Sequence, residues 1–186
     1  IREEQMSKKF FEVFPTLQLD SAEKELFEQV TVERVTSTKR KDFLRIYIMS
    51  EHLIQKMLVL KVEQEIKKQF FPNASMVIKI YEHFRLSAQY DPAKLMDAYR
   101  ESILLELREY SPVEYNLFKK ADIEFEENNN MLLIVEDSVL GRSKTEELIR
   151  ILEKIFQERC GFPLEARVAY KEREEGRFRK EDEQKL

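Results

Sequence analysis

The chain alternates between stretches with an apolar residue at every second position and stretches with one at every third or fourth. The shorter period is typical of half-buried strands and the longer one of amphipathic helices. The first half predicts a helix over 22–28, strands over 30–36 and 43–48, a long helix over 51–69 and a strand over 75–81. We expect Ser50 to cap the long helix. Its apolar stripe would be Ile54, Leu58, Val62, Ile66 and Phe70.

The second half predicts helices over 92–110, 112–119 and 144–160, a hairpin of 122–125 with 131–135, and a last strand over 164–170. Asp91 and Ser111 each stand directly before a proline, which is the usual start of a helix. Ser143 is expected to cap the last helix, and Gly161 to end it in the left-handed conformation.

The order helix, strand, strand, helix, strand therefore occurs twice. Phe43–Tyr81 and Met131–Tyr170 have nearly equal lengths, and each contains a strand, a helix, a Phe-Pro break and a second strand. We predict an α+β fold of two small units, residues 1–88 and 89–171, followed by a charged connector over 172–186. Such a connector suggests a piece of a longer protein. Phe10–Phe14 would add a short apolar first helix that needs a covering neighbour.

The amino-acid composition limits the kinds of binding site and chemistry that the chain can have. The 186 residues are 42% hydrophobic and 37% charged, with 32 basic and 36 acidic side chains, so the chain can bury a core. Only three glycines are present, too few for a Gly-rich phosphate loop. Cys160 is the single cysteine, which suits a reducing cytoplasm. We expect no cofactor, no small-molecule substrate, no signal peptide and no membrane segment.

Metal chemistry is not predicted either. Asp122, Glu124 and Glu126 resemble the paired carboxylates of two-metal nucleases, but a half-exposed strand has the same alternation and no matching downstream aspartates follow. His52 and His83 occur in no metal-binding spacing.

Nucleic-acid binding stays open. Small paired α+β units suggest the KH class, whose Gly-x-x-Gly loop clamps a nucleic-acid backbone. The nearest match is Gly141–Lys144, in which the second glycine is missing, so Arg142 and Lys144 are the candidate contacts. A second basic cluster is formed by Lys39, Arg40 and Lys41. Residues 1–90 carry 15 basic and 13 acidic side chains (+2), whereas residues 91–186 carry 17 and 23 (−6).

Several stretches resemble the N-terminal region of the PolC-type DNA polymerase III alpha subunit, a bacterial replicative polymerase. They are Met6–Phe14, Ser87–Arg100, Leu104–Phe118, Thr145–Lys154 and the charged Phe178–Lys185. In that family the polymerase and 3′-5′ exonuclease sites lie further along the chain. The resemblance therefore implies no catalytic residue, cofactor or metal in this region. It also implies a cytoplasmic location and a second unit similar to the KH-like last domain of the clamp-loader tau subunit.

The resulting hypothesis is a non-catalytic interaction region that tethers a replicative polymerase to another replisome protein, such as the clamp-loader tau subunit. The alternative is a module that binds single-stranded nucleic acid through backbone charge and base stacking. The residues alone leave both open.

Overall fold

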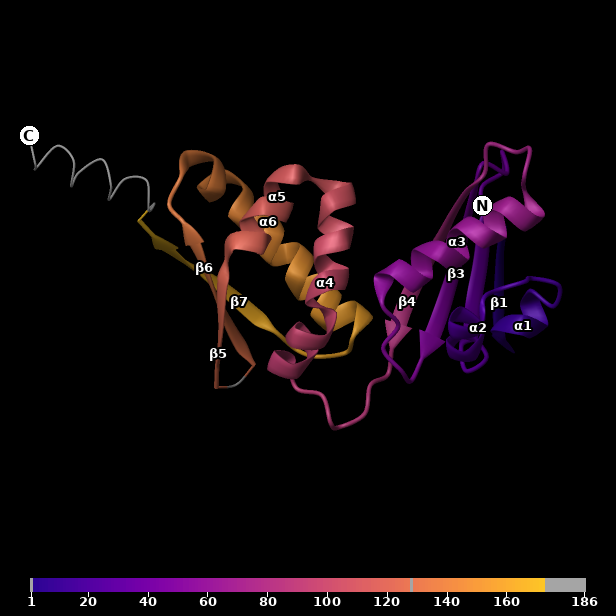
Figure 1. Ribbon diagram of the computed structural model, residues 1–186, viewed down its shortest axis with the longest axis horizontal. Coiled ribbons are helices and arrows are strands. Elements are labelled where there is room, and N and C mark those ends of the chain that lie inside the picture. Colours follow the sequence, from indigo (N-terminus) through magenta and orange to yellow (C-terminus); the bar gives the residue numbers. More distant parts are fainter. Residues whose placement is uncertain (1, 128, 173–186) are drawn as a thin grey trace, which may run out of the picture. The chain divides into compact units, whose positions relative to one another are not determined.

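The computed structural model describes residues 2–127 and 129–172 of the chain. The chain divides into two compact units, the first ending at Tyr90 and also taking in Glu158–Gly161, the second starting at Asp91. Each unit packs helices on a small sheet (Figure 1), so the predicted α+β class is confirmed. Among the described residues, no helix is long and apolar enough to cross a membrane.

The first unit has a four-stranded sheet in the order β1-β2-β3-β4. Its elements are β1 (Arg2–Lys9), α1 (Phe10–Val13), α2 (Ser21–Phe27), β2 (Thr31–Ser37), β3 (Phe43–Ser50), α3 (Lys56–Phe70) and β4 (Val77–Phe84). The first three strands run antiparallel, whereas β3 and β4 are parallel and joined through α3.

All three helices of the first unit lie on one side of its sheet. Phe10 of α1 packs against Phe27 of α2, with ring centroids 4.8 Å apart, and Phe14 meets Phe70 of α3 at 6.1 Å. The apolar first helix is thus covered within its own unit. Buried strand residues under the helices complete the core: Val32, Ile46, Ile48, Ile78 and Ile80.

Two details of this unit differ from the sequence prediction. Strand β1 was not predicted, because its pairing with β2 is long-range and leaves little local signal. The long helix begins at Lys56 rather than at residue 51, because the Ser50 hydroxyl closes a turn with the backbone of His52 instead of capping a helix. Its buried line is consequently Val59, Val62 and Ile66, while Phe70 is exposed.

The second unit has a three-stranded sheet in the order β5-β6-β7. Its elements are α4 (Pro92–Tyr110), α5 (Pro112–Lys120), β5 (Asp122–Glu126), β6 (Asn130–Glu136), α6 (Val139–Lys154) and β7 (Glu165–Lys171). The π-helical turn η1 (Ile155–Arg159) follows α6, and its last two residues belong to the first unit. The hairpin β5–β6 is antiparallel, and β6 pairs in parallel with β7. Both units therefore contain a strand, a helix and an adjacent parallel strand.

Most helix ends of the second unit lie where the local sequence signals predicted them. The Asp91 carboxylate accepts a hydrogen bond from Lys94 N, and Gly161 has φ 72°, as expected. The predicted cap at Ser143 is wrong. Helix α6 begins at Val139, and Ser138 is the cap, since its hydroxyl accepts from Gly141 N at 2.9 Å. Residues 173–186 of the predicted connector lie outside the described part of the chain.

Candidate functional site

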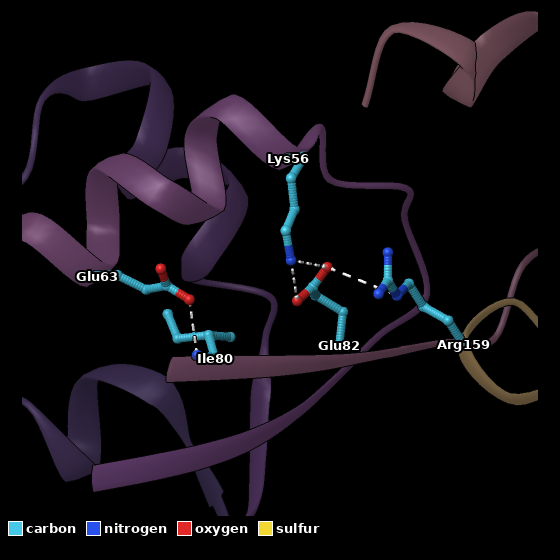
Figure 2. Close-up of polar contacts among 5 residues, drawn as sticks. All are labelled: Lys56, Glu63, Ile80, Glu82 and Arg159. Carbon is cyan, nitrogen blue, oxygen red and sulfur yellow. Dashed lines mark hydrogen bonds and ion pairs between the residues drawn. The ribbon is translucent and has the colours of Figure 1, made fainter. Parts of the chain in front are cut away.

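A cluster of ionisable side chains is buried between α3 and β4 (Figure 2). Lys56 Nζ donates to both carboxylate oxygens of Glu82, at 3.1 and 3.2 Å, and the two side chains are only 3% and 1% exposed. Arg159 Nε lies 3.9 Å from the other side of the Glu82 carboxylate. Because Lys56 and Glu82 are almost fully buried, their chemistry is that of a structural ion pair.

Glu63, on the same helix, points at the edge strand β4 (Figure 2). Its Oε1 accepts a hydrogen bond from the backbone N–H of Ile80 at 2.8 Å. Burial raises the pKa of the Glu63 carboxyl, although the Ile80 hydrogen bond and the charge of Lys56 oppose that rise. An edge amide that is satisfied by a side chain is closed to pairing with another chain. Glu63 thus protects part of the sheet edge.

Arg142 and Lys144 do not lie on a loop. Both are in the first turns of α6, so Gly141–Lys144, the nearest match to a KH-type loop, is helical. Arg142 donates to both oxygens of Asp137, at 2.7 and 3.2 Å, and its guanidinium lies 4.2 Å from the centroid of the Tyr170 ring. The Asp137 carboxylate raises the pKa of Arg142. Lys144 Nζ lies 3.6 Å from Glu147. Arg142 and Lys144 therefore each have an acidic neighbour.

Lys39, Arg40 and Lys41 form the exposed turn between β2 and β3. Lys41 adopts φ 53°, and the Thr38 hydroxyl donates to Asp42 at 2.5 Å across the base of the turn. None of the three basic side chains makes a hydrogen bond or ion pair with a described residue. Their charges are therefore available to an anionic partner.

The acidic side chains of strand β5 lie on an exposed surface of the sheet. Asp122 and Glu126 are paired with cations of β7, Lys171 at 2.9 Å and Arg167 at 2.5 Å. Within residues 2–127 and 129–172, no group of three or more His, Cys, Asp or Glu side chains could hold a metal ion. Cys160 is buried.

A cleft of about 420 Å³ opens between α5 and the start of α6. Its walls combine polar and apolar groups, and the apolar side chains include Val113, Leu117, Val135 and Leu140. Lys120 and Glu136 add one charge of each sign. A cleft of this kind fits the apolar side chains of a partner peptide or helix.

Two large apolar side chains project beside this cleft. Val139 is 90% exposed and Leu140 is 58% exposed, both in the first turn of α6. The sequence pattern missed them because it placed residues 136–143 before the helix. The sequence signal for this exposed pair is two adjacent aliphatic residues directly after Ser138. It indicates an exposed apolar surface only when Ser138, and not Ser143, is known to cap the helix.

Comparison with known proteins finds a family match that lies within the first unit. Residues 9–80 match the family described as DNA polymerase III polC-type N-terminus I, a match that spans α1, α2, β2, β3, α3 and the first half of β4. No curated protein and no solved structure matches the chain. This match supports the resemblance, found in the sequence, to the N-terminal region of a PolC-type DNA polymerase III.

Proposed function

We propose that this region is non-catalytic and tethers a PolC-type polymerase, itself a DNA polymerase with a 3′-5′ exonuclease, to the clamp-loader tau subunit in the bacterial cytoplasm. The exposed pair Val139 and Leu140 beside the α5–α6 cleft carries this proposal. Contiguous exposed apolar side chains next to a cleft are typical of protein interaction sites, and the family match supplies the replisome context.

The proposal keeps the KH-like interpretation of the second unit. An antiparallel hairpin whose second strand pairs in parallel with a third, through an intervening helix, is compatible with that class. In the second unit the single-strand binding alternative has less support, because Gly141–Lys144 is helical and Arg142 is paired with Asp137. Protein binding is therefore the function that this unit's surface favours.

Surface plasmon resonance between the 186-residue chain and purified tau subunit tests the tether. Val139→Asp combined with Leu140→Asp should weaken binding by about 30-fold or more, the effect of losing a central apolar anchor. Met57→Asp is the matched control, since Met57 is 59% exposed on α3 of the other unit. The proposal fails if tau does not bind, or if the control variant weakens binding as much as the double variant.

A further inference from the structure

The sheet of the first unit has a face that none of the described helices covers. Along β4, burial alternates: Ile78 and Ile80 point to the helices and are at most 8% exposed. Val77 and Tyr81 point the other way and are 51% and 37% exposed. We call this second side of β2, β3 and β4 the open face.

One row of the open face is a ladder of a cation and two rings. Arg34, Tyr47 and Tyr81 are direct neighbours across β2, β3 and β4. The Arg34 guanidinium lies 4.0 Å from the centroid of the Tyr47 ring. Tyr47 and Tyr81 are stacked, with centroids 5.0 Å apart and planes 16° apart. Tyr81 ends the ladder at the edge strand, and no other ring of the described residues packs on it.

The next row is basic. Arg45 and Lys79 are direct neighbours on β3 and β4, two residues along from the tyrosines and so about 6.6 Å away. Arg45 Nε is buried and donates to no described residue, while its guanidinium lies 4.9 Å from the Phe43 ring centroid. The guanidinium is a charged donor of the kind that binds anionic oxygens.

The positive charge continues past these rows. The exposed turn Lys39–Lys41 joins β2 to β3 at the end of the sheet beyond Arg45. A described carboxylate near the open face, Glu33, lies at the opposite end, 3.9 Å from Nδ1 of His83. The three basic side chains of the turn therefore extend the cationic part of the face past Arg45, with the Asp42 carboxylate at the base of the turn.

We propose that the open face binds single-stranded DNA. A base would stack on the solvent side of Tyr81 and extend the ladder, while Arg45, Lys79 and the Lys39–Lys41 turn would hold the backbone phosphates. Exposed aromatics on a sheet flanked by cations are the arrangement by which several modules bind unpaired bases. A duplex presents no free base face, so the aromatic row favours a single strand. This inference concerns the first unit and is independent of the tether.

Fluorescence anisotropy of a labelled twelve-residue oligothymidylate, titrated with the 186-residue chain, measures this binding. A dissociation constant of about 10⁻⁴ to 10⁻⁶ M at low salt is expected. If Arg45, Lys79 and one residue of the Lys39–Lys41 turn meet three phosphates, affinity should fall about 20-fold between 50 and 200 mM salt. Tyr81→Ala should weaken binding roughly 5- to 150-fold, whereas Tyr81→Phe keeps the ring and should bind like the original chain.

Lys79→Glu should weaken binding, whereas the control Lys68→Glu makes the same charge change on an exposed position of α3, on the other side of the sheet. NMR spectra of the unmodified chain provide a readout without variants: oligonucleotide should shift the amides of 45–47 and 79–81. The proposal is overturned by no binding at 50 mM salt, by equal binding of a duplex, by tighter binding of oligouridylate, or by equal effects of Lys68→Glu and Lys79→Glu. Shifts at 45–47 and 79–81 caused by the tau subunit and not by DNA would also overturn it, in favour of a protein partner.

Discussion

Replacing Lys56 by Met should strongly destabilise the first unit. The substitution removes both hydrogen bonds to Glu82 and leaves a carboxylate that is 1% exposed, with Arg159 at 3.9 Å as a remaining cation. Losing one partner of a buried ion pair costs about 3–5 kcal/mol, and Arg159 should keep this loss near the lower value. A domain of this size has only about 5–15 kcal/mol of stability. The thermal unfolding midpoint of the first unit should therefore fall by about 12 °C or more.

Urea unfolding followed by far-ultraviolet circular dichroism gives this loss, and hydrogen exchange at α3 and β4 assigns it to the first unit. The chain contains no Trp, so fluorescence is a weaker probe. Lys68→Met on the exposed side of the same helix is the control and should cost under about 0.5 kcal/mol. Lys56→Met with Glu82→Leu should recover most of the lost stability, because apolar residues can replace a buried pair. A loss below about 1 kcal/mol for Lys56→Met alone would refute the reasoning.

Two further predictions concern the polar groups that fix α3 and α6. Glu63→Gln should raise the urea midpoint at pH 8, since Gln still offers an oxygen to Ile80 N and carries no buried charge. Burial raises the pKa of Glu63 in the folded state, so the original chain gains stability as the pH falls through that pKa. The difference in urea midpoint between the Gln variant and the original chain should therefore shrink toward pH 5. A difference that stays constant with pH would contradict this. Ser138→Ala should cost about 1 kcal/mol by removing the cap of α6. A Cβ added at Gly141 would lie 2.7 Å from Ser138 Oγ, so Gly141→Ala should lower the stability of the original chain. In the Ser138→Ala background the clash is removed, and Gly141→Ala should raise the stability. A stability change of the same sign in both backgrounds would be inconsistent with the steric account.

The elements that the sequence predicted well are those with local signals. Asp91-Pro92 starts α4, and its inward residues Leu95, Tyr99 and Ile103 are all buried. Gly161 takes the left-handed conformation that ends its helix. Such features depend on neighbouring residues only, so a pattern of caps and periods is enough to locate them.

The misplaced elements depend on competing or distant partners. Ser50 has the chemistry of a cap, but its hydroxyl bonds to the backbone of His52, and the helix starts five residues later, after Gln55. Strand β1 forms only through its pairing with β2. No local pattern distinguishes these outcomes from the ones expected.

The candidate surfaces illustrate the same limit. Alternation over 75–81 correctly separated Ile78 and Ile80 from Lys79 and Tyr81. It could not show that Tyr81 stacks on Tyr47, because that contact requires the parallel register of β3 and β4. The predicted basic contact Arg142 is paired with Asp137, a partner that the sequence alone did not indicate.

The two units thus present different surfaces: the first a basic, aromatic sheet face, the second an apolar cleft beside Val139 and Leu140. A region with two such surfaces can bind a protein and a nucleic acid through separate units. Variants on one surface should therefore leave binding at the other unchanged.

The central claim is that the second unit holds the protein partner at its α5–α6 cleft. NMR spectra of the isotope-labelled chain, recorded with and without unlabelled tau subunit, test it most directly. We predict that amide signals of 113–120 and 138–141 shift or broaden, while those of β2, β3 and β4 stay in place. Binding that leaves the cleft signals unchanged, or that perturbs only the first unit, would contradict the account.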